Sequence, residues 1–192
     1  MKKQEKMEVL VGCIEKKLMC DCSFEGENYS VSLYPAAVNE KFVLGHEESD
    51  FQLNGCCIRR FSDLKKVRQC GEKFNEICRM LGVTGDLARP YVDISDWESV
   101  FESLTRLDIF VEIEDTDGDT FTIGRIEKYG RKSVSVRYFD TEGVWAESRR
   151  KIRYADISVL KWGTRYGNGW KQYFEMTQAS EQKRDTSEED QK

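Results

Sequence analysis

Residues 153–157 read RYADI, and residues 60–64 read RFSDL. Each segment has an arginine, an aromatic residue, a small residue, an aspartate and a branched aliphatic residue in the same order. A second pair of similar segments, VGCIEK at 11–16 and IGRIEK at 123–128, occurs in the same order along the chain. Two matches in the same order predict a tandem duplication. We therefore expect the two halves of the chain to share one fold.

The second copy has the pattern of short β-strands. Apolar and polar residues alternate over 109–114 and again over 134–138, as expected for strands with one buried face. Turn residues separate these segments, because Asp and Gly tolerate the backbone of tight turns. A glycine inside a strand, expected at Gly12 and Gly124, suits a sharp bend. The pattern predicts five strands, at 109–114, 121–126, 134–138, 145–154 and 157–162, in a small bent barrel.

The segment between the two copies has helical periodicity. Apolar residues at i, i+3, i+4 and i+7 predict helices over 74–81 and 97–104. Ser95 and Glu98 predict a capping box at the start of the second helix. The spacing of the repeats also predicts a longer middle in the first copy, within 24–50.

These patterns divide the chain into four parts. We expect a first barrel over 1–70, a helical connector over 71–106 and a second barrel over 107–176. The tail, 177–192, has one apolar residue, Ala179. A segment this polar cannot bury a core, and it is expected to be disordered.

A helix followed by five bent strands, with a glycine in the second strand, resembles the Sm-like small β-barrel. The resemblance rests on IGRI at 123–126, GVW at 143–145 and YADI at 154–157, and it covers most of the chain. The chain is also similar to a group of uncharacterised bacterial proteins built as two such barrels in tandem. The resemblance implies a mainly β fold with connecting helices, arranged as two tandem five-stranded Sm-like barrels. It also implies that 127–133 and the arginines near 149–151 correspond to the RNA-contacting loops of Sm proteins.

The cysteines and the single histidine limit the possible chemistry. The seven cysteines all lie in the first 78 residues, and no secretory signal precedes them, which predicts free thiols in the reducing cytoplasm. Their C-x-C and C-C spacings do not fit a zinc site. His46 lies in an acidic segment, GHEESD at 45–50, and is expected to be exposed. We therefore expect no catalytic residue, no metal, no cofactor and no enzyme activity.

Two further motifs suggest sites but are incomplete. Asp115, Asp117 and Asp119 match the first ligands of a calcium loop, but Thr120 and Ile126 stand where that loop needs Gly and Glu. An acidic hairpin turn that pairs with basic residues is expected instead. The segment GTRYGNG at 163–169 lacks the Lys-Ser/Thr of a phosphate loop and is expected to be a flexible turn. No apolar run reaches the length of a membrane span, so no membrane partner is expected.

The segment 125–171 is strongly basic, with twelve Lys or Arg against five Asp or Glu. Its interleaved aromatic residues allow two interpretations: a barrel core beneath solvated charges, or a surface for phosphates and unpaired bases. We expect a non-catalytic binding or regulatory module that presents loops or sheet edges to a partner protein. The alternative is a single-stranded RNA- or DNA-binding protein. Its candidate binding residues are Arg125, Lys128, Arg131, Lys132, Arg149, Arg150, Lys151 and Arg153.

Overall fold

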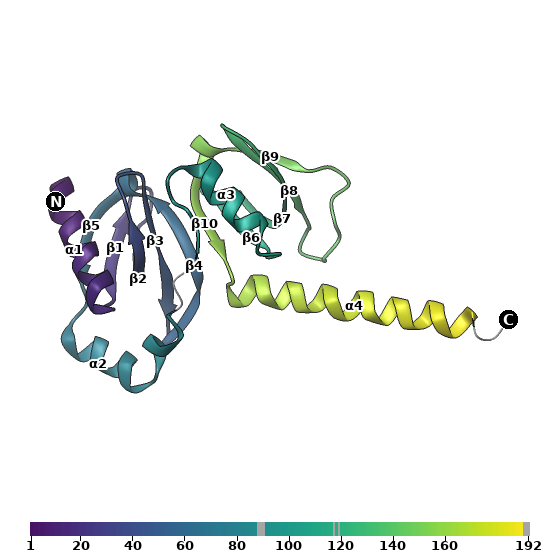
Figure 1. Cartoon of the computed structure of the whole chain (residues 1–192), viewed down its shortest axis with the longest axis horizontal. Helices are drawn as coiled ribbons and strands as arrows, with labels where there is room; N and C mark the ends of the chain where they lie inside the picture. Colours follow the sequence, from purple (N-terminus) through teal and green to yellow (C-terminus); the bar gives the residue numbers. More distant parts are fainter. Residues whose placement is uncertain (88–90, 117, 119, 190–192) are drawn as a thin grey trace.

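The computed structural model describes residues 1–87, 91–116, 118 and 120–189. Within this part, ten strands form one antiparallel sheet in the order β5-β1-β2-β3-β4-β10-β6-β7-β8-β9 (Figure 1). The first half contributes β1 (Cys20–Phe24), β2 (Ser30–Val38), β3 (Phe42–Ser49), β4 (Gln52–Arg60) and β5 (Leu64–Gln69). The second half contributes β6 (Val111–Asp115), β7 (Phe121–Tyr129), β8 (Ser133–Tyr138), β9 (Arg150–Arg153) and β10 (Ile157–Trp162).

Four helices accompany the sheet in the described part: α1 (Lys3–Lys16), α2 (Glu72–Met80), α3 (Trp97–Thr105) and α4 (Arg165–Glu189). Figure 1 shows α1 beside the first half, α3 in the second half and α4 extending away from both. The expected mainly β class with connecting helices is therefore confirmed. The expectation of two separate five-stranded barrels is wrong, because β4 of the first half pairs with β10 of the second in one open sheet. This pairing satisfies backbone groups that two separate units would leave at their edges.

The RFSDL and RYADI segments occupy equivalent places. Each carries a short 3-10 turn, η1 (Phe61–Asp63) or η3 (Tyr154–Asp156), between the fourth and fifth strands of its half. The fifth strand then pairs with the first, and the register shifts at Lys65 in one half and at Ser158 in the other. Strand order and register irregularity therefore repeat together, as a tandem duplication predicts.

The other matched pair is coincidental. Residues 11–16 lie in α1, where Leu10 and Cys13 are buried three residues apart, whereas 123–128 lie in β7. A Cβ atom on Gly12 would meet nothing within 4 Å. A Cβ atom on Gly124 would lie 1.9 Å from the carbonyl oxygen of Arg137. The longer middle expected in the first copy is also wrong, because it depended on this match and the halves are nearly equal when strands are compared.

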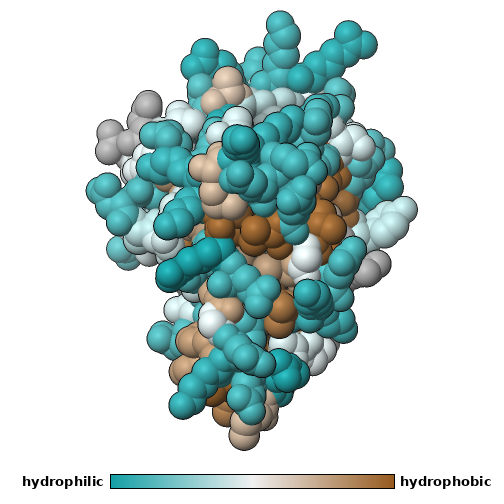
Figure 2. Space-filling model, turned by 90° about the vertical axis from the view of Figure 1, so that its left-hand side faces the viewer, coloured by the Kyte–Doolittle hydropathy of each residue, from teal (hydrophilic) through white to brown (hydrophobic). Residues whose placement is uncertain are grey.

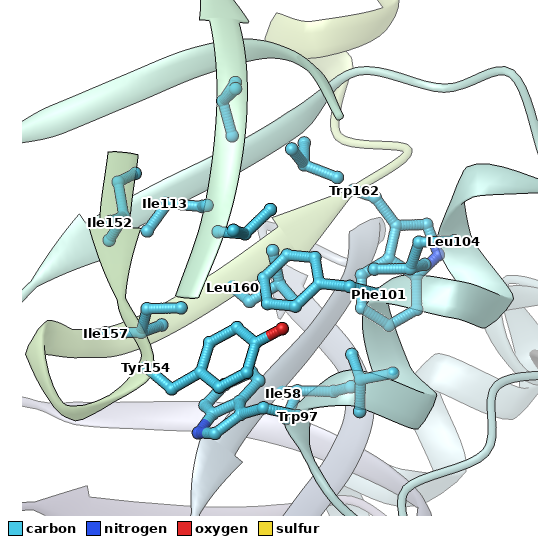
Figure 3. Packing of buried hydrophobic residues seen from close by; sticks show 14 of the residues in the cluster. Ile58, Trp97, Phe101, Leu104, Ile113, Ile152, Tyr154, Ile157, Leu160 and Trp162 are labelled. Carbon is cyan, nitrogen blue, oxygen red and sulfur yellow. The ribbon is translucent and has the colours of Figure 1, made fainter. Parts of the chain in front are cut away.

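The core is shared between the two halves. Side chains of β4 and β10 alternate between two clusters: Cys57 and Val159 enter the first-half core, and Ile58 and Leu160 enter the second. Figure 3 shows Ile58 beside Trp97 of α3, close to the Tyr154 ring. The α3 helix therefore covers the second half and the junction at once.

The predicted helices over 74–81 and 97–104 are confirmed as α2 and α3. The capping box at Ser95 is wrong: Asp96 is the N-cap, and its Oδ1 atom accepts the backbone N–H of Ser99 at 2.9 Å.

The structure replaces the turn expected at 163–169 with the start of α4. The Thr164 Oγ1 atom accepts the Gly167 N–H at 2.9 Å, as an N-cap does. Trp170 and Phe174 then anchor the helix on the second half. The backbone stays helical to Glu189, through most of the tail expected to be disordered. Gln, Glu and Lys favour helix once it has begun, and 190–192 lie outside the described residues.

The two glycines that look equivalent in the sequence should behave oppositely on mutation. Gly124→Ala should destabilise the protein by about 3 kcal/mol, because its Cβ would overlap the backbone of β8. Gly12→Ala should stabilise it by about 0.5–1 kcal/mol, because alanine favours an open helical position. Urea unfolding of both variants checks this. Equal effects would contradict the assignment of residues 11–16 to a helix.

Candidate binding interface

The outer surface of β7, β8 and β9 carries a row of cations on neighbouring strands. Arg125 lies opposite Arg137, Ser135 lies between Lys128 and Lys151, and Ser133 lies opposite Arg153. On the other surface, Val134, Val136 and Ile152 are buried in the core. We call the exposed set the cationic face: Arg125, Lys128, Arg137, Lys151 and Arg153.

Sequence reasoning named four members of the cationic face and missed Arg137. The sequence does indicate this position: Val134 and Val136 alternate with polar residues, so Arg137 lies on the surface opposite to the two valines. Register across β7 and β8 then places Arg137 beside Arg125. Residue counting along the chain does not provide that pairing.

The other four candidates lie off the cationic face. Arg131 and Lys132 are exposed in the turn between β7 and β8, where they line a cavity of about 640 Å³ with Arg153. Arg149 lies before β9, 3.9 Å from Glu127. Arg150 is on the inner surface, where it donates to Thr122 Oγ1 at 2.9 Å and stacks on the Tyr138 ring. The structure therefore brings four of the eight candidates onto the cationic face, places Arg131 and Lys132 beside Arg153, and turns Arg150 to the inner surface.

Few acids neutralise the cationic face. Arg153 donates two 2.7 Å hydrogen bonds to Asp156, which lower the pKa of that carboxyl. In the described part of the chain, Arg125, Lys128, Arg137 and Lys151 form no ion pair. Exposed cations without acidic partners attract anions from solution, so this surface fits an anionic partner.

Aromatic residues that alternate with these cations in the sequence are largely covered. Phe139, Trp145, Trp170 and Phe174 pack together where α4 meets one end of the cationic face. The Arg137 guanidinium lies over the Trp145 ring, 5.4 Å from its centre. Tyr154 and Trp162 are buried in the second-half core. Most aromatic rings of the basic stretch therefore contribute to packing, whereas Tyr166 is 50% exposed.

The cationic face adjoins an open sheet edge, because β9 pairs only with β8 among the described strands. The Tyr154 N–H donates to the Lys132 carbonyl of the β8 side at 2.9 Å. Successive N–H groups of a strand point in opposite directions. The N–H groups of Lys151 and Arg153 therefore point away from β8, into the open edge.

The opposite edge of the sheet, β5, is also charged. Lys65, Lys66 and Arg68 are exposed there, and Arg68 donates to Asp21. The Lys6 ammonium of α1 hydrogen-bonds the Leu64 carbonyl at the start of this strand. Figure 2 views this side of the molecule, which is mostly hydrophilic with an apolar area near its centre. Lysine on an edge strand discourages the addition of a strand that carries no acids.

At the junction the charges are buried or half-buried, and they are paired. Arg59 is 3% exposed and binds Glu27 and Glu47, the latter at 3.4 Å. Lys161 lies 3.3 Å from Glu47 and 3.0 Å from Glu114. Burial lowers the pKa of Lys161, but the two carboxylates outweigh it and raise that pKa to about 12. Arg60 adds hydrogen bonds to the carbonyls of Tyr154 and Ala155.

The histidine expected in solvent is buried. His46 is 7% exposed within β3, because its segment pairs with β4. Its Nδ1 atom lies 3.5 Å from the Cys56 Sγ atom. Burial raises the pKa of the Cys56 thiol to about 12, so the pair holds a protonated thiol at neutral pH.

The cysteines are free, as expected, and all except Cys56 are buried. The described residues contain no group of three His, Cys, Asp or Glu suited to hold a metal. Of the acidic turn, Asp117 and Asp119 lie outside the described residues. No described helix has the length and apolar character to cross a membrane.

Comparisons with protein-family models, curated proteins and solved structures gave no match to this chain.

The buried junction arginine should matter much more for stability than an exposed one. Arg59→Ala should destabilise the protein by about 3–5 kcal/mol, because it leaves the largely buried Glu27 without its partner and leaves Glu47 with Lys161 alone. Arg106→Ala removes an exposed pair with Glu102 and should change stability by at most about 0.5 kcal/mol. Urea unfolding at pH 7 measures both. A loss below about 1 kcal/mol for Arg59→Ala would contradict the assignment.

The Lys161 pair should also give a pH dependence at high pH. Its folded pKa of about 12 is above the ordinary value of 10.5. The stabilisation is therefore complete below pH 10.5 and is lost as the pH rises through 12. Unfolding of Lys161→Met and the unmodified protein, from pH 8 upward, should give stabilities that converge at high pH. Parallel curves would refute the linkage.

Proposed function

We propose that this chain is a non-catalytic binding module that presents its cationic face and the adjoining β9 edge to an acidic partner protein. The observation that carries this proposal is the position of four exposed, unneutralised cations beside an open strand. Electrostatic attraction guides such a partner to the surface, and the strand edge offers directional hydrogen bonds.

We also propose that each half derives from an Sm-like unit. The order of fifth, first, second, third and fourth strand is the same in both halves, and each half has a helix before its first strand. In this proposal the second half carries binding, and the first half, with its buried cysteines, supports the sheet.

Several observations favour a binding role over catalysis. Cys56, the thiol nearest the histidine, stays protonated because burial raises its pKa to about 12. The carboxyl of Glu112 is buried and accepts a hydrogen bond from Thr164 at the start of α4. These groups act in packing, and the exposed charges of the cationic face remain for a partner.

Protein is favoured over nucleic acid because of where the aromatic residues lie. Binding of unpaired bases depends on exposed rings as stacking platforms. Tyr154 and Trp162 are buried instead, and Trp145 lies under Arg137. One observation still favours nucleic acid as the second candidate, because Arg131 and Lys132 extend the cations of the cationic face around the β7–β8 turn.

A pull-down from nuclease-treated extract tests the proposed function. The tagged protein should recover one stoichiometric protein, and the double variant Lys128→Glu/Lys151→Glu should lose it. The matched control, Lys65→Glu/Lys66→Glu, reverses two charges on the other sheet edge and should retain the partner. Equal recovery by both variants would contradict the assignment to the cationic face.

Oligonucleotide binding tests the second candidate. Seven phosphate contacts would weaken binding on the order of 10³-fold between 50 and 200 mM salt. We expect weak binding at 50 mM salt that the Lys128→Glu/Lys151→Glu variant does not change. Tight, salt-sensitive binding lost in that variant would replace the protein partner with single-stranded RNA or DNA.

A further inference from the structure

The junction shows how an edge of this fold takes up another strand. Along β4 and β10, Ile58 lies opposite Leu160, and Cys57 lies opposite Lys161. The apolar residues enter the two cores, and acids from neighbouring strands, Glu47 and Glu114, neutralise the lysine. A strand is therefore accepted where apolar residues meet and every cation finds a carboxylate.

The two free edges do not match each other in this way. The repeat makes β9 equivalent to β4 and β5 equivalent to β10, so a second copy would be expected to dock β5 on β9. In the register of the junction, that contact would place Arg150 opposite Arg68. Tyr138 stands where the first half has Glu47. Arg68 already pairs with Asp21, so Arg150 would lie opposite an arginine with no carboxylate at the Glu47 position to neutralise it.

An acidic strand fits β9 much better. Lys151 and Arg153 point to the outer surface, and Ile152 between them points to the core. A strand with acid, apolar and acid residues in succession would match this row. The chain contains a partial precedent: Glu112-Ile113-Glu114 of β6 lies against β10, with Glu112 opposite Lys161, Ile113 opposite Leu160 and Glu114 opposite Val159. Glu114 forms the ion pair with Lys161.

We propose that β9 takes up an acidic extended segment of the partner protein as an added strand of the sheet. This inference rests on the proposed function and specifies its partner. The N–H groups of Lys151 and Arg153 bind carbonyls of the segment, and its apolar residue covers Ile152. One of its acids pairs with Lys151, and a second lies beside Arg153, which also holds Asp156. Backbone pairing supplies affinity, and the alternation of side chains supplies specificity.

Labelled peptides test this mode of binding directly. The probe is a fluorescein-labelled peptide in which glutamate and valine alternate over eight residues. The control peptide has four glutamates followed by four valines, so its charge and composition are the same. By fluorescence anisotropy, the alternating peptide should bind roughly tenfold more tightly or better. Equal affinity would overturn strand addition, because charge alone would then explain binding.

A backbone variant separates strand addition from attraction to the cationic face. Lys151→Pro removes an N–H from the open edge, and Lys151→Ala is the matched control for the lost charge. The proline variant should lose the preference for the alternating peptide, and the alanine variant should keep it. Circular dichroism verifies folding. If proline disturbs the fold, an alternating peptide N-methylated at every residue replaces it and should lose its binding.

The outcomes separate this inference from the proposed function. One outcome is that neither Lys151→Pro nor N-methylation of the peptide weakens peptide binding, while the pull-down still recovers the partner. The partner then binds the cationic face without adding a strand. If charge reversal does not release the partner, the proposed function itself fails. Sedimentation at 10–200 µM should find monomers, and a concentration-dependent oligomer lost in Lys151→Pro would assign the β9 edge to a second copy.

Discussion

The pairing of β4 with β10 is the interaction on which the rest of this structure depends. It joins the halves into one sheet and directs alternate side chains of both strands into two cores. It also buries Arg59 and half-buries Lys161, which are tolerated because Glu27, Glu47 and Glu114 surround them. Burying a charge is costly without a partner, so the carboxylates of β3 and β6 specify where the halves meet.

The same pairing makes the ends of the sheet different from its middle. Where strands meet internally, apolar residues lie opposite each other and cations are neutralised. At β5 and β9, lysines and arginines face solvent. The cationic face arises in the second half because α4 covers only one end of the outer surface with aromatic rings. The sheet therefore has two basic edges, and of these β9 adjoins the cationic face.

Sequence patterns predicted the strands of the second half and the helices α2 and α3, because alternation and 3.6-residue periodicity report burial directly. The patterns failed at Gly12, because one of the two similar hexapeptides lies in a helix and the other in a strand. A short match in sequence does not determine whether a segment pairs in a sheet. The patterns also failed at His46 and Arg137, whose surroundings depend on register with β4 and β7. Their environment is set by strands distant in sequence, which residue spacing does not reveal.

Binding by this chain depends on whether the open edge of β9 accepts an acidic strand. Amide hydrogen exchange of Lys151 and Arg153, resolved by NMR with and without the alternating acidic peptide, tests it most directly. Both amides should exchange fast in the free protein and at least roughly tenfold more slowly with the peptide bound. Unchanged exchange at both amides under saturating peptide would contradict it.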